Sequence, residues 1–200
     1  MRRRAALLLP ALAAPPAAAA GDDIAFRVLR RGEQVGTHRV RCARRGAQRV
    51  ATSELLIRPA VMGIVVYRYE HVYEEVTEDG RFVSVASRLN RNGRIVEVRG
   101  QAVPGAVVLD GTAGPQRLPA EAAPLSWWEP GRMGGRVPVF GTTTGRALDL
   151  AWDIRRDPAG GVEYACTGEV TARVHFDRAG RWDRFWARGE DGNDITYAAA

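Results

Sequence analysis

The 200-residue sequence contains no lysine, so arginine supplies all 29 of its basic side chains. The formal net charge of +6 raises the question of nucleic-acid binding. Arg2, Arg3 and Arg4 account for half of that excess, and without them 26 basic side chains oppose 23 acidic ones, leaving +3. The other arginines are scattered among carboxylates and, with the abundant alanine and glycine, indicate a compositional bias. The sequence therefore predicts no nucleic-acid partner and only weak electrostatic attraction to membranes.

The chain also lacks an apolar run long enough to span a bilayer, which takes about 20 residues in a helix. Its N-terminal apolar run, residues 5–12, follows three arginines and precedes the small residues 18–20, an order typical of a signal peptide. We expect residues 1–20 to be a signal peptide that is removed, and residues 21–200 to form a single β-rich domain without a transmembrane segment. The protein is then expected to be periplasmic or secreted. The paired arginines leave both the general secretory and the twin-arginine export routes open.

Cysteine occurs only twice, as Cys42 and Cys166. In an oxidising compartment an even number of cysteines suggests a disulfide, which for so long a loop would stabilise the fold by roughly 5 kcal/mol. Both cysteines alternate in phase with apolar neighbours, so both side chains are expected to point inward. The pattern fits a Cys42–Cys166 disulfide and two buried thiols equally well.

Stretches with helical periodicity are absent, and short alternating runs are separated by glycine, asparagine and aspartate turns. The most strand-like run, residues 64–76, places Tyr67, Tyr69, His71 and Tyr73 on one face and charged side chains on the other. The spacing of turns predicts about eleven strands, and a flat open sheet of that size would leave exposed edges. We therefore predict an all-β, mainly antiparallel fold: a strongly curved meander sheet that is a half-barrel or barrel-like.

A proline-rich segment, residues 113–135, interrupts the strand pattern. Its prolines exclude a regular strand, but it could hold one or two helical turns. This expected excursion contains Ser126, Trp127 and Trp128, and strands resume after it with an alternating row that includes Trp152. The sequence has no long linker and no internal repeat, which favours one domain.

Metal-binding patterns are weak. His175 and Asp177 are two residues apart, so they would share a strand face, but the neighbouring turn makes surface polar residues the preferred interpretation. His38 and Cys42 share an inward face, but no third and fourth ligand accompany them. The sequence therefore predicts neither a metal site nor a cofactor.

Nucleophilic catalysis finds little support. Ser126 precedes a pair of tryptophans, but no glycine elbow surrounds it. His71 stands among tyrosines, where a core histidine with a hydrogen-bonded ring is preferred over an acid–base group. Glu70 and Glu74 share a charged face with Arg68, so we interpret them as cross-strand pairing partners and not as a glycosidase pair.

Four short segments occur in the order GTHRV (36–40), VYRYEH (66–71), PLSWWEP (124–130) and TGR (144–146). With them the chain resembles a family of exported bacterial proteins of unknown function, in which a tyrosine-rich strand and a proline-bracketed serine–tryptophan segment are typical. This resemblance implies no assigned activity. The meander with one long excursion is also similar in architecture to the curved half-barrels of periplasmic lipoprotein carriers, and architecture alone does not determine function.

Our leading hypothesis is a non-enzymatic protein that binds an apolar or amphipathic, lipid-like ligand in the concave face of the sheet. The side chains expected to line or cover that face are Tyr67, Tyr69, His71, Tyr73, Trp127, Trp128 and Trp152. One alternative is an envelope-assembly or protein-interaction module, which an apolar patch around Trp182 and Trp186 would favour. A further alternative is a hydrolase that uses Ser126 or His71.

Overall fold

The computed structural model describes residues 23–189 and 191–200, and the expected signal peptide at 1–20 lies outside the described residues. Within these ranges every regular element is a β-strand apart from one short 3₁₀ turn. No helix in the described part of the chain is long and apolar enough to cross a membrane. The prediction of an all-β, mainly antiparallel fold is confirmed.

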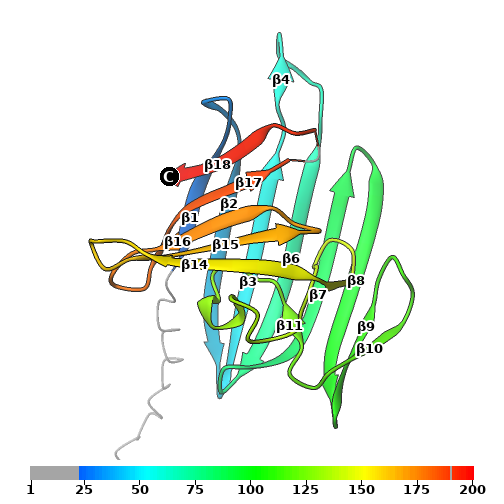
Figure 1. The fold of residues 1–200 in the computed structure, drawn as a ribbon. Coiled ribbons are helices and arrows are strands. Elements are labelled where there is room, and N and C mark those ends of the chain that lie inside the picture. The colour runs from blue at the N-terminus through cyan, green and yellow to red at the C-terminus, as the bar shows by residue number, and fades with distance from the viewer. Residues whose placement is uncertain (1–22, 190) are drawn as a thin grey trace, which may run out of the picture.

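Thirteen strands form one curved antiparallel sheet (Figure 1). In their spatial order they are β10 (Gln116–Leu118), β9 (Ala106–Asp110), β8 (Arg94–Val103), β7 (Arg81–Arg91), β6 (Tyr69–Glu78), β3 (Gln48–Ile57), β2 (Glu33–Arg45), β1 (Ile24–Arg30), β18 (Asp194–Ala199), β17 (Trp182–Arg188), β16 (Ala172–Phe176), β15 (Val162–Gly168) and β14 (Leu150–Arg156). Most neighbours are consecutive in the chain, but β3 pairs with β6 and the first strand, β1, pairs with the last, β18. This last pairing joins the two halves of the chain into one sheet.

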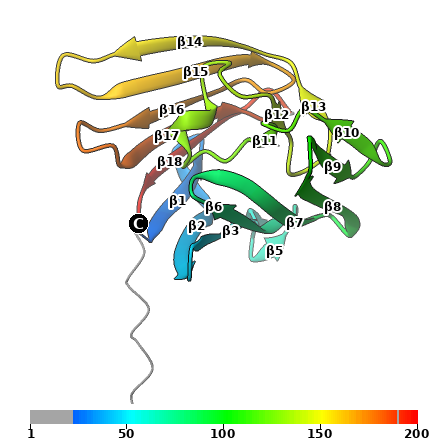
Figure 2. The same cartoon turned by 90° about the horizontal axis from the view of Figure 1, so that it is seen from below.

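The sheet is open between its edge strands β10 and β14. Residues 119–149 connect these two strands and lie between the two arms of the curved sheet (Figure 2). This segment contains β11 (Ala123–Pro124), the 3₁₀ turn η1 (Pro130–Arg132), β12 (Val139–Phe140) and β13 (Ala147–Leu148). The excursion expected at 113–135 therefore starts after β10 and extends to residue 149, and we use the name excursion for residues 119–149 below.

The excursion supplies part of the hydrophobic core. Its Met133 and Phe140 are fully buried and belong to one cluster with Val28 of β1, Leu109 of β9 and Val174 of β16. A sheet of 13 curved strands encloses more space than its own inward side chains fill, as in wide barrels. The excursion fills that space, so the centre of the concave side is occupied by the protein's own side chains.

The single strand expected at 64–76 is interrupted in the structure. Its first residues form β5 (Ile64–Val65), which pairs with β4 (Ala60–Val61) in a separate hairpin before β6 begins. Met62 and Gly63 have positive φ angles of 51° and 82°, which fold the chain back. The backbone N–H of Arg68 then donates to Oδ1 of Asn92 at 2.7 Å. Alternation along a sequence does not reveal such a change of pairing partner, so the prediction of one continuous strand was wrong.

Candidate functional site

Three buried polar side chains connect the excursion to the sheet, and we call them the Glu75 cluster: Glu75, Ser126 and Arg132. Glu75 of β6 is only 1% exposed and forms an ion pair with Arg132 of η1. Ser126 donates a hydrogen bond from Oγ to Glu75 Oε2 at 2.5 Å, and Arg132 Nη1 donates to the carbonyl oxygen of Pro124 at 3.1 Å. Burial raises the pKa of the Glu75 carboxyl, and the Arg132 guanidinium opposes that shift. The cluster therefore fixes the excursion to the inner face of β6.

A second ion pair between the same two parts of the chain lies nearer the surface. Arg49 of β3 pairs with Glu129 of the excursion, and its Nη2 lies 3.1 Å from the sulfur of Cys42. The Arg49 and Glu129 side chains remain 36% and 25% exposed, whereas those of Arg132 and Glu75 are 8% and 1% exposed. The two pairs thus differ mainly in how far water reaches them.

An aromatic row runs along the inner face of β6 to the excursion, and we call it the aromatic stack: Tyr69, His71, Tyr73 and Trp128. The ring centroids of Tyr69 and His71 are 6.5 Å apart. His71 stacks on Tyr73 at 5.0 Å, and Tyr73 stacks on Trp128 at 5.4 Å. Tyr69 is half-buried, whereas the other three are buried. The stack therefore leads from the start of β6 into the core.

His38 lies close to this stack in an aromatic environment. Its ring centroid is 5.5 Å from that of Trp182 and 5.3 Å from that of Tyr197, and its Nε2 is hydrogen-bonded to Ser53 Oγ at 2.9 Å. The other ring nitrogen, Nδ1, is buried and has no hydrogen-bond partner among the described residues. Burial, with a contribution from His71, lowers the pKa of His38 to about 3. The ring is therefore neutral at neutral pH.

His71 is a buried, hydrogen-bonded histidine. Its Nε2 lies 3.0 Å from Ser87 Oγ, which in turn donates to the carbonyl oxygen of Thr142 at 2.7 Å. Burial lowers the pKa of His71 to about 4. Ser126, the serine of the hydrolase alternative, donates to Glu75 and is 0% exposed. The structure therefore does not present Ser126 to solvent as an accessible nucleophile.

The structure brings together four of the seven side chains that we expected to line one face. The remaining three, Tyr67, Trp127 and Trp152, are half-buried and lie outside the stack. Tyr67 precedes β6, and Trp127 packs on Phe185 of β17 with ring centroids 5.0 Å apart. Trp152 lies on β14 near the excursion, where its Cδ1 would be 3.8 Å from a Cβ at Gly135. These three aromatic side chains therefore lie apart from one another and do not line one face with the stack.

Sequence reasoning missed Glu75 and Arg132. The alternation that places Tyr73 inward also places Glu75 inward, and a carboxylate at an inward position predicts a buried partner. Glu70 and Glu74, in contrast, lie on the other face as expected, with Glu74 exposed and Glu70 paired with Arg68 at 3.5 Å. The inward signal for Glu75 was therefore available in the sequence, but its partner was not.

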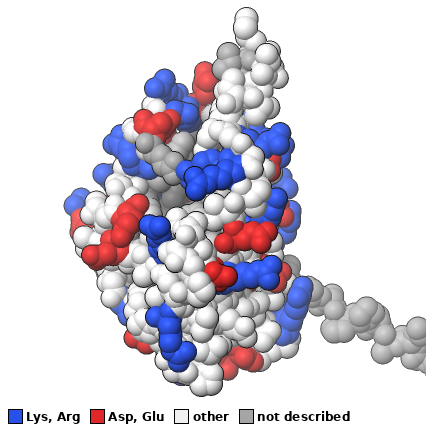
Figure 3. Space-filling view, turned by 90° about the vertical axis from the view of Figure 1, so that its right-hand side faces the viewer, with Lys and Arg blue, Asp and Glu red and all other residues white. Residues whose placement is uncertain are grey.

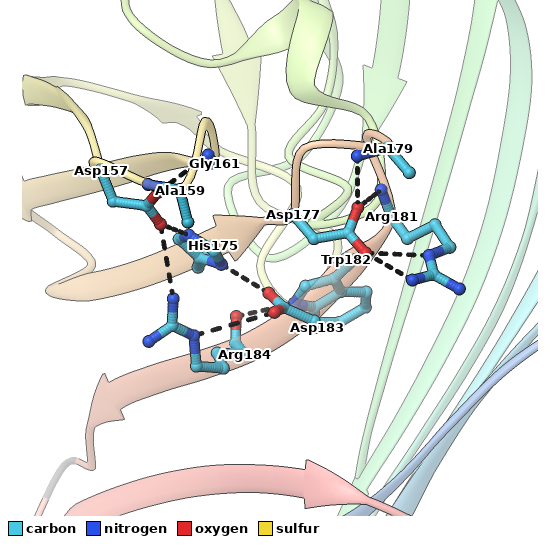
Figure 4. Close-up of polar contacts among 10 residues, drawn as sticks. All are labelled: Asp157, Ala159, Gly161, His175, Asp177, Ala179, Arg181, Trp182, Asp183 and Arg184. Carbon is cyan, nitrogen blue, oxygen red and sulfur yellow. Dashed lines mark hydrogen bonds and ion pairs between the residues drawn. The ribbon is translucent and has the colours of Figure 1, made fainter.

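His175 differs from its expected surface position. It is buried, with Nδ1 2.6 Å from Asp183 and Nε2 2.8 Å from Asp157 (Figure 4). Gly161 covers it, since a Cβ there would lie 2.5 Å from His175 Nε2. Burial alone would lower the pKa of His175, but the hydrogen bonds to Asp183 and Asp157 raise it. Among the described residues no group of three or more His, Cys, Asp or Glu side chains is arranged so that it could hold a metal ion. Each aspartate engages one ring nitrogen of His175, so we interpret this arrangement as a structural clamp.

The two cysteines are both free thiols. Cys42 lies on β2 and Cys166 on β15, and four other strands separate these two in the sheet. At about 4.8 Å per strand this is roughly 24 Å along the sheet, whereas a disulfide needs Cα atoms within about 7 Å. The disulfide alternative is therefore wrong for this structure. Burial raises the pKa of Cys166 to about 11 and also raises that of Cys42, which makes both thiols poor nucleophiles.

Comparison with solved structures shows a similar fold. The chain is similar to the crystal structure of a β-barrel-like protein of the domain of unknown function DUF1849 from Brucella abortus, with 9% sequence identity and a TM-score of 0.56. The alignment covers 89% of this chain and 94% of that protein, and it confirms the barrel-like architecture. No functionally curated protein matches the chain. A family model does match, over residues 26–200, and the chain therefore belongs to the family described as Domain of unknown function (DUF6134).

Proposed function

We propose that the protein is exported and binds an apolar or amphipathic ligand, without catalysing a reaction, on the inner face of the sheet beside His38. The observation that supports ligand binding is the buried Nδ1 of His38, which has no hydrogen-bond partner among the described residues. Buried polar atoms are almost always paired, so a polar group from outside the chain would complete this one. The rings of Trp182 and Tyr197 beside His38 offer contacts for an apolar body. A ligand with one polar group and an apolar body matches both features.

Tyr69 gives this region an approach from the surface. It is half-buried at the start of β6, and its ring lies 6.5 Å from that of His71. Burial raises the pKa of Tyr197, and the charge of Tyr69 adds to that shift. Tyr69 therefore lies at the half-buried end of the aromatic stack beside His71, and an entering ligand would contact it first. The excursion, held by the Glu75 cluster, would stay in place.

The two alternatives from the sequence receive less support from the geometry. The interaction module was linked to an apolar patch around Trp182 and Trp186, but Trp182 is buried in the core. Trp186 is half-buried, with the guanidinium groups of Arg173 and Arg188 within 5.0 and 5.5 Å of its ring centroid. The hydrolase would use Ser126 or His71. The Ser126 hydroxyl is fully buried and donates to Glu75, and His71 is buried with its Nε2 hydrogen-bonded to Ser87.

Native mass spectrometry of the protein, purified without detergent from the envelope of its own host, tests the proposal. We expect removal of the residues before position 21, together with an adduct that leaves on denaturation and behaves as a lipid-like molecule on extraction. A clean mass without adduct, also after incubation with envelope lipid extract, would overturn the ligand proposal. An unprocessed chain recovered from the cytoplasm would overturn the export proposal.

A pair of matched tyrosine variants separates a ligand site from a filled core. Tyr69→Ala removes the side chain at the approach, and Tyr164→Ala removes an equally half-buried tyrosine that packs on Phe176 of β16. We expect the Tyr69 variant to lose the adduct and to keep most of its stability, and the Tyr164 variant to keep the adduct. If both variants lose stability and both retain the adduct, Tyr69 is ordinary core and the proposed approach is wrong.

A further inference from the structure

The hairpin of β4 and β5, with the residue that follows it, carries the most exposed large apolar side chains among the described residues. Met62 at its turn is 99% exposed, and Ile64, Val66 and Val65 are 70%, 58% and 47% exposed. The hairpin extends beyond the ends of the neighbouring strands (Figure 1), and in Figure 3 it is the uncharged projection at the top of the molecule. Monomeric soluble proteins rarely expose apolar residues in such a group, so this surface calls for a functional explanation.

Comparison with the other tight turns shows that the fold does not require an apolar tip. Four hairpins have a two-residue turn in which a residue with positive φ precedes a glycine with positive φ. The first turn residue is Arg31, Met62, Asp79 or Asn92, with φ of 53°, 51°, 48° and 50°. Asparagine and aspartate tolerate this conformation best, and methionine has no intrinsic advantage there. Met62 is thus an exposed apolar residue where the backbone favours a polar one.

The distribution of the apolar side chains indicates what covers the hairpin. Successive residues of a strand point to opposite faces, so Ile64 and Val66 face one way and Val65 the other, with Met62 at the tip. All of these side chains are exposed, so both faces of the hairpin are apolar. A groove on a partner protein would cover one face of such a ribbon. The interior of a lipid layer surrounds an inserted tip on every side.

The base of the hairpin is polar in the way that a membrane interface requires. Arg58 and Arg68 flank the hairpin, about half of each side chain is exposed, and both pair with the single carboxylate of Glu70. One positive charge therefore remains for anionic headgroups. Tyr67 follows at the same level, and tyrosine is enriched at membrane interfaces. From Pro59 to Met62 the chain extends about 10 Å, which matches the depth at which interfacial segments insert.

We propose that the β4–β5 hairpin inserts its tip into the surface of an anionic lipid bilayer and so docks the protein on a membrane. This inference needs no ligand at His38 and so stands independently of the proposed function. It also agrees with the weak overall charge, because apolar side chains provide most of the attraction and the paired arginines add a local contribution.

Vesicle flotation of the protein lacking residues 1–20 tests the docking. Vesicles of phosphatidylcholine and phosphatidylglycerol in equal parts should bind the protein more strongly than vesicles of phosphatidylcholine alone. Met62→Asn should lower the partition coefficient about tenfold, because one fully exposed apolar side chain no longer enters the lipid. The same change should leave stability unchanged or raise it, since asparagine suits the positive φ at this turn.

The control is Val108→Asn, which replaces an exposed apolar residue of β9 and should leave vesicle binding unchanged. Absence of binding to either vesicle type would overturn the proposal, and so would equal binding of wild-type protein and the Met62 variant. Sedimentation of both proteins without lipid identifies the competing occupant. If wild-type protein is a dimer and the Met62→Asn variant is a monomer, a second copy of the chain covers the hairpin, and the lipid proposal is refuted.

Discussion

Replacing Glu75 by glutamine is the sharpest test of how the excursion is held. Glutamine keeps the shape of the side chain and removes its charge. Arg132, with its side chain 8% exposed, would then be a buried cation without a counterion, and Ser126 would lose the charged acceptor of its 2.5 Å hydrogen bond. The variant therefore isolates the electrostatic part of the Glu75 cluster from the packing of the excursion.

The magnitude follows from the burial of the pair. Breaking a buried ion pair by removing one partner costs about 3–5 kcal/mol, whereas an exposed pair contributes about 0–1 kcal/mol. Arg49→Gln breaks the half-exposed pair with Glu129, which joins the same two parts of the chain, so it is the matched control. We expect Glu75→Gln to cost about 4 kcal/mol and Arg49→Gln less than about 1 kcal/mol.

Urea unfolding followed by tryptophan fluorescence measures both changes, because two of the five tryptophans, Trp127 and Trp128, lie in the excursion. With a slope of about 2 kcal/mol per molar urea, the Glu75 variant should unfold at about 2 M less urea than wild-type protein. The double variant Glu75→Gln with Arg132→Met should lose less stability than the two single variants summed, by about 2 kcal/mol. Equal midpoints for Glu75→Gln and Arg49→Gln would refute the reasoning.

The remaining predictions concern titration and backbone space. Burial lowers the pKa values of His38 and His71, so the fold has its full stability above pH 6.5, where both rings are neutral, and loses stability as the pH falls. At pH 5 each histidine lowers the free energy of unfolding by about 2 kcal/mol. In urea unfolding, the loss of stability between pH 7 and pH 5 should therefore be about 2 kcal/mol smaller for His71→Gln than for wild-type protein. The pKa of His175 is raised, so its contribution is complete below pH 6.5 and is lost at higher pH; thermal unfolding of His175→Gln should differ most from wild type at pH 6 and least at pH 9. Gly36→Ala should destabilise the fold by several kcal/mol, because its Cβ would lie 1.9 Å from a carbonyl oxygen of β3. In Gly131→Ala the added Cβ meets nothing within 4 Å, so the free energy of unfolding in urea should change by less than about 0.5 kcal/mol. Equal effects of the two variants would contradict the steric argument.

The alternation of side chains predicted the fold class because a half-buried strand records its orientation in every second residue. His71 and Tyr73 point inward as their positions imply, and the abundance of strands without helical runs implied a curved sheet. Alternation contains no information on which strands become neighbours. The pairing of β1 with β18, and the opening between β10 and β14, therefore could not be predicted from the pattern.

A β-bulge explains a further failure of alternation. Phe176 pairs with Trp182 and His175 pairs with Arg184, so Asp183 is an extra residue in β17. The bulge reverses the phase within the strand, so Trp182 points inward together with Phe185, whereas simple alternation places Trp182 on the same face as Arg184 and Trp186. Trp182 is consequently core, so it does not contribute to the apolar surface patch that would have favoured an interaction module. The same extra residue, Asp183, contacts His175, which explains why a histidine expected at the surface is clamped.

The candidate site depended on pairings between distant residues. Alternation indicates that Glu75 points inward, but its partner Arg132 comes from the excursion, and no local pattern connects the two. The buried Nδ1 of His38 is likewise visible only once Trp182 and Tyr197, from the other end of the chain, are placed beside it. Sequence could therefore name the aromatic strand, but it could not separate its surface end from its buried end.

The strand β6 links the features on which both proposals depend. The apolar hairpin precedes its first residue, Tyr69 marks the half-buried end of the aromatic stack, and Glu75 holds the excursion about 20 Å further along, at 3.3 Å per residue. If the hairpin tip enters a bilayer, the end of β6 that faces the lipid is the end at which Tyr69 is accessible. The anchored excursion then lies away from the membrane, so an apolar molecule leaving the bilayer would meet Tyr69 before any part of the Glu75 cluster. Under both proposals a ligand would reach the sheet at Tyr69, and the ion pair that stabilises the interior would stay away from the lipid.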